Sequence, residues 1–101
     1  MVNLKSKDDE GFTPLHFASF HGNPDMISIL VSYGADVYER NYKGASMMHV
    51  AAQGDQPFSL SFFRDKGLEL DIADDLGNTP LHWACLLSSF MSIHYLMAFG
   101  A

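Results

Sequence analysis

The sequence contains a single cysteine, Cys85, among its 101 residues. One cysteine cannot form a disulfide within the chain, so a disulfide-stabilised secreted fold is excluded and a reducing compartment is expected. The stretch MVNLKSKDDEGF also lacks the continuous apolar core of a signal peptide. We therefore expect a cytoplasmic protein.

Basic residues are scarce as well, with 6 Lys and Arg against 12 Asp and Glu and a net charge of −6. No basic cluster could follow a phosphate backbone, which excludes nucleic acid as a partner. An acidic chain that is 48% hydrophobic is typical of a globular domain that binds proteins or basic peptides. The sequence has no glycine-rich phosphate loop and no paired-carboxylate motif, so we expect no cofactor.

Charged residues are missing altogether from residues 76–101. A run of about 20 apolar residues is long enough to span a membrane. However, Pro80 and Gly100 interrupt this run, and His82 and His94 reduce its hydrophobicity. We therefore expect no membrane insertion of this segment.

The sequence repeats itself every 33 residues. The segments GFTPLHFASFHG, GASMMHVAAQGD and GNTPLHWACLLS begin at Gly11, Gly44 and Gly77. A fixed period of this kind indicates stacked units, each of which buries its apolar face against its neighbours. We divide the single domain, residues 1–101, into a lead-in (1–10), repeat 1 (11–43), repeat 2 (44–76) and a truncated repeat 3 (77–101).

Each repeat is expected to form two short helices. Thr13 and Asn23 are good N-caps, each followed by a proline, and Gly34 is a good C-cap. Residues 35–43 are polar and predict an extended, hairpin-like return to the next repeat. Met47 replaces the first proline in repeat 2, so we expect its first helix to start less sharply.

The motifs TPLHFA and TPLHWA, together with the 33-residue period, resemble the ankyrin repeat over residues 8–101. The resemblance implies an all-α ankyrin-repeat solenoid of stacked helix–turn–helix units joined by hairpin-like turns. It also implies a non-catalytic module that binds a protein or extended peptide on its concave face. The alternative is a purely structural spacer within a larger scaffold protein.

Residues 49–85 further resemble the ankyrin repeats that precede the membrane-bound catalytic region of DHHC-type protein palmitoyltransferases. In that family the repeats recruit substrates on the cytosolic face of the membrane and a separate domain transfers the acyl group. By this resemblance the chain is not itself an enzyme. It would be the recruiting part of an acyltransferase.

Cys85 and His82 form the one candidate catalytic pair, because a Cys–His arrangement can activate a thiol nucleophile. The residues equivalent to Cys85 are Ser19 and Ala52, and all three are small. Free cysteine is commonly a small buried residue. We therefore favour a packing role, with Cys85 buried.

His16, His49 and His82 are the candidate metal ligands, since they recur once per repeat. Zinc requires each ligand nitrogen within about 2 Å, whereas packed helices lie about 8–10 Å apart. Three equivalent histidines in successive repeats cannot converge on one ion. We predict instead that they hydrogen-bond the turns, together with Thr13, Ser46 and Thr79, and tie neighbouring repeats together.

The candidate partner-binding residues lie in the turn before each first helix and on that helix's exposed side. They are Phe12, Phe20, His21, Tyr42, Lys43, Gln53, Asp75, Leu76, Asn78, Trp83, Leu86 and Leu87. Exposed aromatic and apolar side chains often mark an interaction site. An equally acceptable interpretation has Phe20, Leu86 and Leu87 half-buried between repeats.

Trp83 is equivalent to Phe17 and Val50, which are expected to fill the core. A tryptophan also carries an N–H that needs a hydrogen-bond acceptor. We predict that Trp83 reaches the groove edge near Gln53, where the two residues help to hold an extended peptide.

The last predicted helix, residues 90–99, is apolar on more than one side. Terminal repeats usually present a polar outer face. We expect that a further repeat follows in the natural protein, and that the present chain can self-associate through this end.

Overall fold

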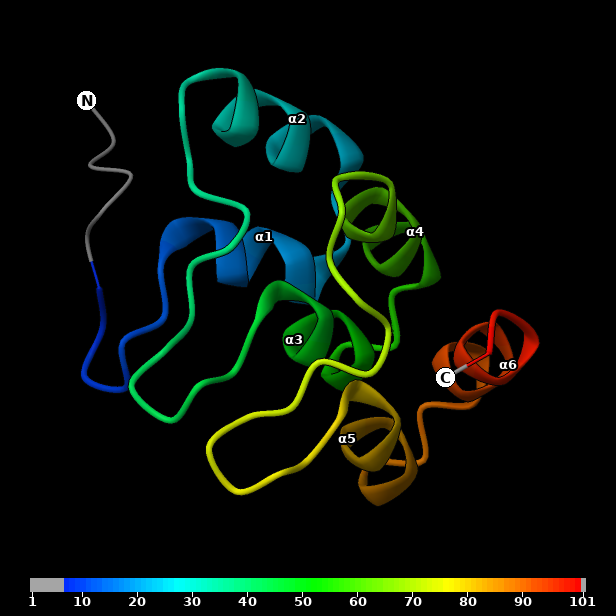
Figure 1. Ribbon diagram of the computed structural model, residues 1–101. Coiled ribbons are helices and arrows are strands. Elements are labelled where there is room, and N and C mark those ends of the chain that lie inside the picture. Colours follow the sequence, from blue (N-terminus) through cyan, green and yellow to red (C-terminus); the bar gives the residue numbers. More distant parts are fainter. Residues whose placement is uncertain (1–6, 101) are drawn as a thin grey trace.

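Residues 7–100 are described by the computed structural model, and they form six helices. These are α1 (Pro14–His21), α2 (Pro24–Ser32), α3 (Met47–Gln53), α4 (Pro57–Asp65), α5 (Pro80–Leu86) and α6 (Phe90–Ala98). Helices α1, α3 and α5 form one row and α2, α4 and α6 a second, and the loops between repeats reach past the first row (Figure 1). The predicted all-α solenoid of helix–turn–helix units is confirmed.

The first helix of every repeat begins in the same way. Thr13, Ser46 and Thr79 all have extended backbone with φ of −93°. Each donates its backbone N–H to the Nδ1 atom of the histidine three residues later, at 2.9, 3.1 and 2.9 Å. Helix α3 therefore begins as sharply as α1 and α5 although Met47 replaces the proline. The prediction of a less sharp start was wrong, because the hydroxyl and histidine cap the helix without the proline.

A left-handed residue separates the two helices of each repeat. Gly22 takes a φ of 69°, and Asp55 and Ser88 take φ values of 53° and 55° at the equivalent positions. The side chain of Asn23 then accepts the backbone N–H of Met26 and caps α2, as predicted. The turn is tight, so the two helices of a repeat pack antiparallel.

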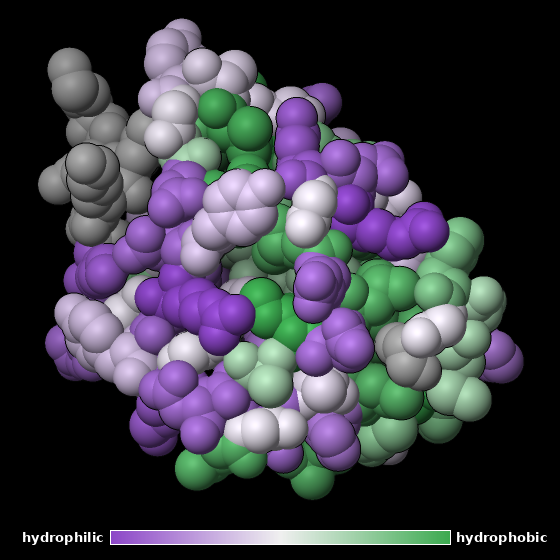
Figure 2. Space-filling model, viewed as in Figure 1, coloured by the Kyte–Doolittle hydropathy of each residue, from purple (hydrophilic) through white to green (hydrophobic). Residues whose placement is uncertain are grey.

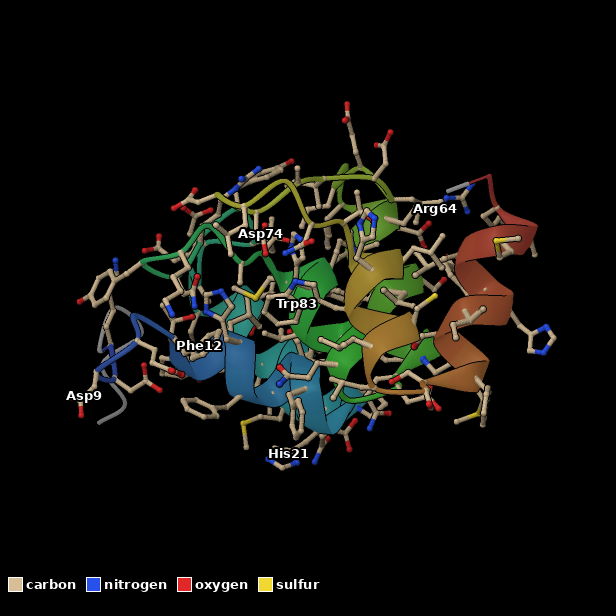
Figure 3. All side chains as sticks on the ribbon, turned by 90° about the horizontal axis from the view of Figure 1, so that it is seen from below. Asp9, Phe12, His21, Arg64, Asp74 and Trp83 are labelled. Carbon is tan, nitrogen blue, oxygen red and sulfur yellow. The ribbon has the colours of Figure 1, made fainter. Side chains whose placement is uncertain are left out.

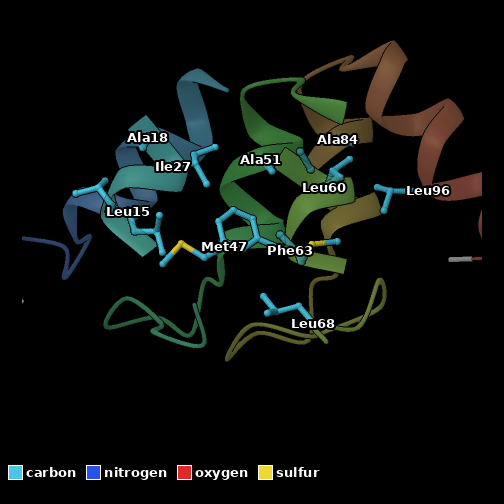
Figure 4. Packing of buried hydrophobic residues seen from close by; sticks show 13 residues of the cluster. Leu15, Ala18, Ile27, Met47, Ala51, Leu60, Phe63, Leu68, Ala84 and Leu96 are labelled. Atoms are coloured by element: carbon cyan, nitrogen blue, oxygen red, sulfur yellow. The ribbon is translucent and has the colours of Figure 1, made fainter. Parts of the chain in front are cut away.

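The hydrophobic core is centred on repeat 2. Helix α3 contacts α1, α4, α5 and α6. Met47 and Met48 from α3, and Leu60 and Phe63 from α4, are completely buried. Figure 4 shows Met47, Leu60 and Phe63 between the residues contributed by repeats 1 and 3. Repeat 2 therefore holds the other two repeats together.

Helix α6 is hydrophobic and largely exposed. Phe90, Met91 and Met97 are 68%, 58% and 63% exposed. Figure 2 shows hydrophobic residues gathered at the end of the molecule that α6 forms. Each of the longest helices in residues 7–100 has nine residues, and none is long and apolar enough to cross a membrane.

Candidate functional site

The loops that precede α1, α3 and α5 share one turn. The side-chain oxygen Oδ1 of Asp8, Asn41 or Asp74 accepts two backbone N–H groups, from the residues two and four positions later, at 2.7 to 3.0 Å. Such turns replace missing backbone hydrogen bonds with a side-chain acceptor. The 33-residue spacing of these three residues was a signal of the turn that the sequence interpretation missed.

Backbone hydrogen bonds join neighbouring loops. The N–H of Tyr42 donates to the carbonyl of Glu10 at 3.0 Å, and the N–H of Asp75 donates to the carbonyl of Lys43 at 2.9 Å. Together the loops form a continuous wall along the row of first helices.

A first hollow lies between this wall and helices α1 and α3. Phe12, Phe17 and Phe20 provide an aromatic surface, and Asp8 and Glu10 provide carboxylates at its loop side. His16, His21, Val50 and Gln53 complete the lining. Phe12 contacts His16 and Phe17 edge-on, with ring centroids 5.4 and 6.3 Å apart. The hollow is thus apolar on its helix side and acidic at its rim.

A second hollow lies along α5. It is lined by Gln53, Asn78, His82, Trp83, Leu86 and Leu87. Gln53 belongs to both hollows. The two hollows therefore adjoin at Gln53, and together, as the groove, they draw their lining from all three repeats.

Trp83 is fixed in this groove by the wall. Its Nε1–H donates to Oδ2 of Asp74 at 3.1 Å, and its ring packs edge-on against His49 at 5.2 Å between centroids. Figure 3 shows Trp83 beneath the loop that carries Asp74. Partial burial works against the carboxylate, but hydrogen bonds from the Asn78 N–H, Trp83 and the Leu76 N–H outweigh it and lower the pKa of Asp74. Trp83 thus enters the groove near Gln53, while its N–H is held by Asp74.

His49 links repeat 2 to repeat 3. Because the backbone N–H of Ser46 donates to Nδ1, the imidazole is the neutral tautomer with its proton on Nε2. The Nε2–H then donates to the carbonyl of Asn78 at 2.8 Å. Both ring nitrogens of this buried residue are satisfied. The predicted role of the histidine, as a tie between repeats, is confirmed here.

His16 and His82 make only the first of these two contacts. The Nδ1 atoms of both accept from the threonine cap, as in His49. The Nε2 atom of His16 is buried and has no hydrogen-bond partner within the described residues, although the Ala45 carbonyl lies nearby. His82 is exposed. Within residues 7–100, His49 is therefore the one of these three histidines whose two ring nitrogens both have hydrogen-bond partners.

The histidines also make the fold sensitive to acid. Burial lowers the pKa values of His16 and His49 below the ordinary 6.5. The unfolded chain therefore binds protons that the folded chain does not, and stability falls as the pH drops below about 6.5, by at most about 1.4 kcal/mol per pH unit for each histidine. Protonation of Nδ1 of His49 would also destabilise the fold, because two N–H donors would then face each other and the hydrogen bond from the Ser46 N–H would be lost.

We expect urea unfolding midpoints to decrease between about pH 7.5 and about pH 5. Protonation of Asp74 also destabilises the fold, but only at lower pH, because the ordinary pKa of 3.8 for this carboxyl is lowered further by folding. The variant His49→Gln should show a smaller dependence of stability on pH. An unchanged pH dependence in this variant would contradict the assignment.

Eight of the twelve candidate residues line the groove. The other four lie at the loop tips, outside both hollows, and all are exposed. They are Tyr42, Lys43, Asp75 and Leu76. Phe17 and Val50 line the groove although they were expected to be core residues. That expectation was wrong for Phe17, which is 50% exposed.

Phe20, Leu86 and Leu87, for which the sequence allowed two interpretations, differ in their exposure to solvent. Phe20 is half-buried, whereas Leu86 is 85% exposed and Leu87 is 50% exposed. Leu86 and Leu87 therefore belong to the surface, while Phe20 lies partly between repeats.

Cys85 is exposed, so the prediction that it is buried was wrong. Its equivalents Ser19 and Ala52 are buried because a following repeat covers them, and no described helix packs on that side of α5. The Nδ1 of His82 is held by Thr79 and not by the thiol. Within residues 7–100 no three His, Cys, Asp or Glu residues are placed to hold a metal ion.

Comparison with known proteins agrees with this architecture. The Ankyrin repeat family model matches residues 10–42 and 76–101. Protein phosphatase 1 regulatory subunit 27 of Mus musculus is 32% identical over 79 residues, which cover 78% of this chain and 51% of that protein. Palmitoyltransferase AKR1 of Lachancea kluyveri is 29% identical over 93 residues, which cover 88% of this chain and 13% of the enzyme.

A third relative is the transient receptor potential cation channel subfamily A member 1 of Homo sapiens, 29% identical over 98% of this chain and 9% of the channel. The chain thus spans about half of the length of the phosphatase regulatory subunit and much less of the other two relatives. Residues 43–75, nearly all of repeat 2, lie outside the matched residues, yet repeat 2 has two helices and the same cap as its neighbours. With the family model covering more than half of the sequence, the chain belongs to the ankyrin-repeat family.

Proposed function

We propose that the chain is a non-catalytic module that binds an extended segment of another protein in the groove. The observation that carries the proposal is that the two hollows lie next to each other and share Gln53. An extended segment can contact both hollows in turn, because their lining residues come from all three repeats. The main alternative is a structural spacer, for which a groove with exposed aromatic side chains has no use.

The acidic end of the groove favours a basic residue in the partner. Asp8 and Glu10 flank the aromatic rings of Phe12, Phe17 and Phe20 in the first hollow. A lysine or arginine side chain is attracted both to carboxylates and to aromatic faces. The net charge of −6 strengthens this preference at long range.

The second hollow, at the other end of the groove, favours an apolar residue in the partner. Trp83, Leu86 and Leu87 line the second hollow, and none of the described residues that line it is Asp, Glu, Lys or Arg. Because Trp83 is already held by Asp74, little side-chain freedom is lost when a partner packs on its ring. We expect Trp83 to contribute most to affinity, with Gln53 hydrogen-bonding the partner's backbone between the two ends.

Selection from a library of random linear peptides tests the proposal. Binders should contain a basic residue followed or preceded by an apolar one. Trp83→Ala should weaken their binding by about tenfold or more, the loss typical of a central aromatic residue. Glu10→Gln should weaken binding less, and its effect should shrink at high salt.

Tyr33→Ala is the matched control, because Tyr33 is 78% exposed and lies outside both hollows. It should leave affinity unchanged. Selected peptides that bind Trp83→Ala with full affinity would rule out the groove as the binding site. A library that yields no binder would favour the spacer.

The finer role that we propose is recruitment of substrate proteins for an acyl transfer on the cytosolic face of a membrane. The similarity to Palmitoyltransferase AKR1 supports it. The similarity to a protein named as a regulatory subunit of a phosphatase is compatible with a role apart from catalysis. Hydrophobic spans and a Cys/His-rich segment encoded beyond Ala101 would support this role, and their absence would end it.

A further inference from the structure

Asp74 uses its two carboxylate oxygens for different purposes. Oδ1 accepts the backbone N–H groups of Leu76 and Asn78 at 3.0 and 2.8 Å and so forms the turn before α5. Oδ2 accepts the indole N–H of Trp83 at 3.1 Å. The turn therefore occupies one oxygen, and the other oxygen binds a residue of the groove.

The turn itself does not need the second oxygen. Asn41 forms the same turn before α3 with its Oδ1, which accepts the backbone N–H groups of Lys43 and Ala45 at 3.0 and 2.7 Å. A side-chain amide has one acceptor oxygen, and its nitrogen only donates. Because an amide is sufficient at the equivalent position in repeat 2, the turn does not explain the carboxylate of Asp74.

The bond to Trp83 is specific to repeat 3. The residues equivalent to Trp83 are Phe17 and Val50, and neither has a side-chain N–H. Helices α1 and α3 nevertheless begin with the same hydroxyl and histidine cap as α5. The repeat architecture thus forms without this bond, and its role lies in the groove, where Trp83 lines the second hollow.

The bond also decides which part of the indole faces a partner. Asp74 lies on the wall and does not line the second hollow, so the N–H of Trp83 is directed away from that hollow (Figure 3). His49 packs edge-on against the same ring, with centroids 5.2 Å apart, so the ring is held from two sides. The hydrocarbon part of the indole is left to the hollow, beside Leu86 and Leu87.

We propose that Asp74 determines the specificity of the second hollow without touching the partner. Its carboxylate occupies the one hydrogen-bond donor of Trp83 and fixes the ring with that donor turned away. A polar side chain of the partner that packs on this ring loses its hydrogen bonds to water without replacement. This role rests on the proposed binding of an extended segment in the groove.

The preference for an apolar side chain tests this role. The probes are a peptide selected from the random library, with leucine at its apolar position, and the same peptide with glutamine there. Asp74→Asn keeps the turn, but its amide nitrogen then faces the indole N–H, and two donors cannot bond. The indole turns and becomes free to donate to glutamine. The preference for leucine should therefore fall by about threefold to tenfold, the range for one ordinary hydrogen bond.

Two controls separate this role from the effects of charge and folding. Asp75→Asn removes the same charge from an exposed neighbour outside both hollows and should leave the preference unchanged. Trp83→Phe has no indole N–H, so adding Asp74→Asn to it should not change its preference either. Circular dichroism should show the same helix content in every variant. An equal fall in Asp75→Asn, or a fall caused by Asp74→Asn in the Trp83→Phe background, would overturn the proposal.

A measurement without any peptide tests the bond directly. The chain has one tryptophan, so proton–nitrogen correlation spectra contain a single indole N–H resonance. This resonance should move upfield in Asp74→Asn, because the hydrogen bond to a carboxylate is lost, and should stay in place in Asp75→Asn. An unmoved resonance in Asp74→Asn would overturn the proposal even if no peptide binds.

The peptide measurements also tell the two proposals apart. If Trp83→Ala binds the peptides with full affinity, the groove is not the binding site and both proposals fail. If Trp83→Ala weakens binding while Asp74→Asn keeps the full preference for leucine, the groove remains the binding site and only the role of Asp74 fails.

Discussion

Replacing His49 by alanine should lower the free energy of unfolding by about 3–5 kcal/mol. The change removes the Ser46 N–H···Nδ1 bond that caps α3 and the Nε2–H···O bond to Asn78. It also leaves a cavity at a position that is completely buried. A loss of this size is a large part of the total stability of an ordinary domain.

The same substitution at His82 provides the matched control. His82 accepts the Thr79 N–H at 2.9 Å, just as His49 accepts that of Ser46, but it is exposed. His82→Ala should therefore cost only about 1 kcal/mol, the usual loss for a helix cap. Urea denaturation followed by circular dichroism measures both. Equal losses for the two variants would mean that neither the Asn78 bond nor the burial of His49 contributes to stability.

The helices could be predicted from the sequence because their signals are local. Thr13, Ser46 and Thr79 each precede a histidine by three residues, and this pair caps the helix whatever residue lies between. The prediction of a less sharp start for α3 was wrong because it rested on the missing proline at Met47. The cap formed by Ser46 and His49 determines where the helix begins. The hairpin-like loops follow from Asp8, Asn41 and Asp74, whose period was visible but was not used.

Burial could not be predicted from the repeat pattern alone. Equivalence with Ser19 and Ala52 predicted a buried Cys85, and equivalence with Val50 predicted a buried Phe17. Both predictions assumed a neighbouring repeat on each side, which only repeat 2 has within the described chain. The groove was predicted in part, since eight of the twelve candidate residues line it, but the repeat pattern does not encode that Gln53 is shared by two hollows.

Phe63→Ala should be as damaging as the loss of His49, with a decrease in unfolding free energy of about 3–5 kcal/mol. Phe63 on α4 is completely buried in the hydrophobic core and contacts Phe62 edge-on, with ring centroids 5.1 Å apart. Phe58, on the same helix, is 44% exposed. Phe58→Ala should change stability by less than about 1 kcal/mol.

The Phe63 variant also tests whether the three repeats unfold together. The chain has one tryptophan, Trp83, and it lies in repeat 3, so fluorescence reports on repeat 3 while circular dichroism reports on all six helices. Because α3 and α4 contact α5 and α6, loss of packing at Phe63 should shift both signals to the same lower urea concentration. A fluorescence midpoint that stays at the wild-type value would show that repeat 3 keeps its structure without repeat 2. The bond from His49 to Asn78 would then be too weak to couple them, and the groove, which needs Gln53 of repeat 2 beside Trp83 of repeat 3, would not survive as one surface.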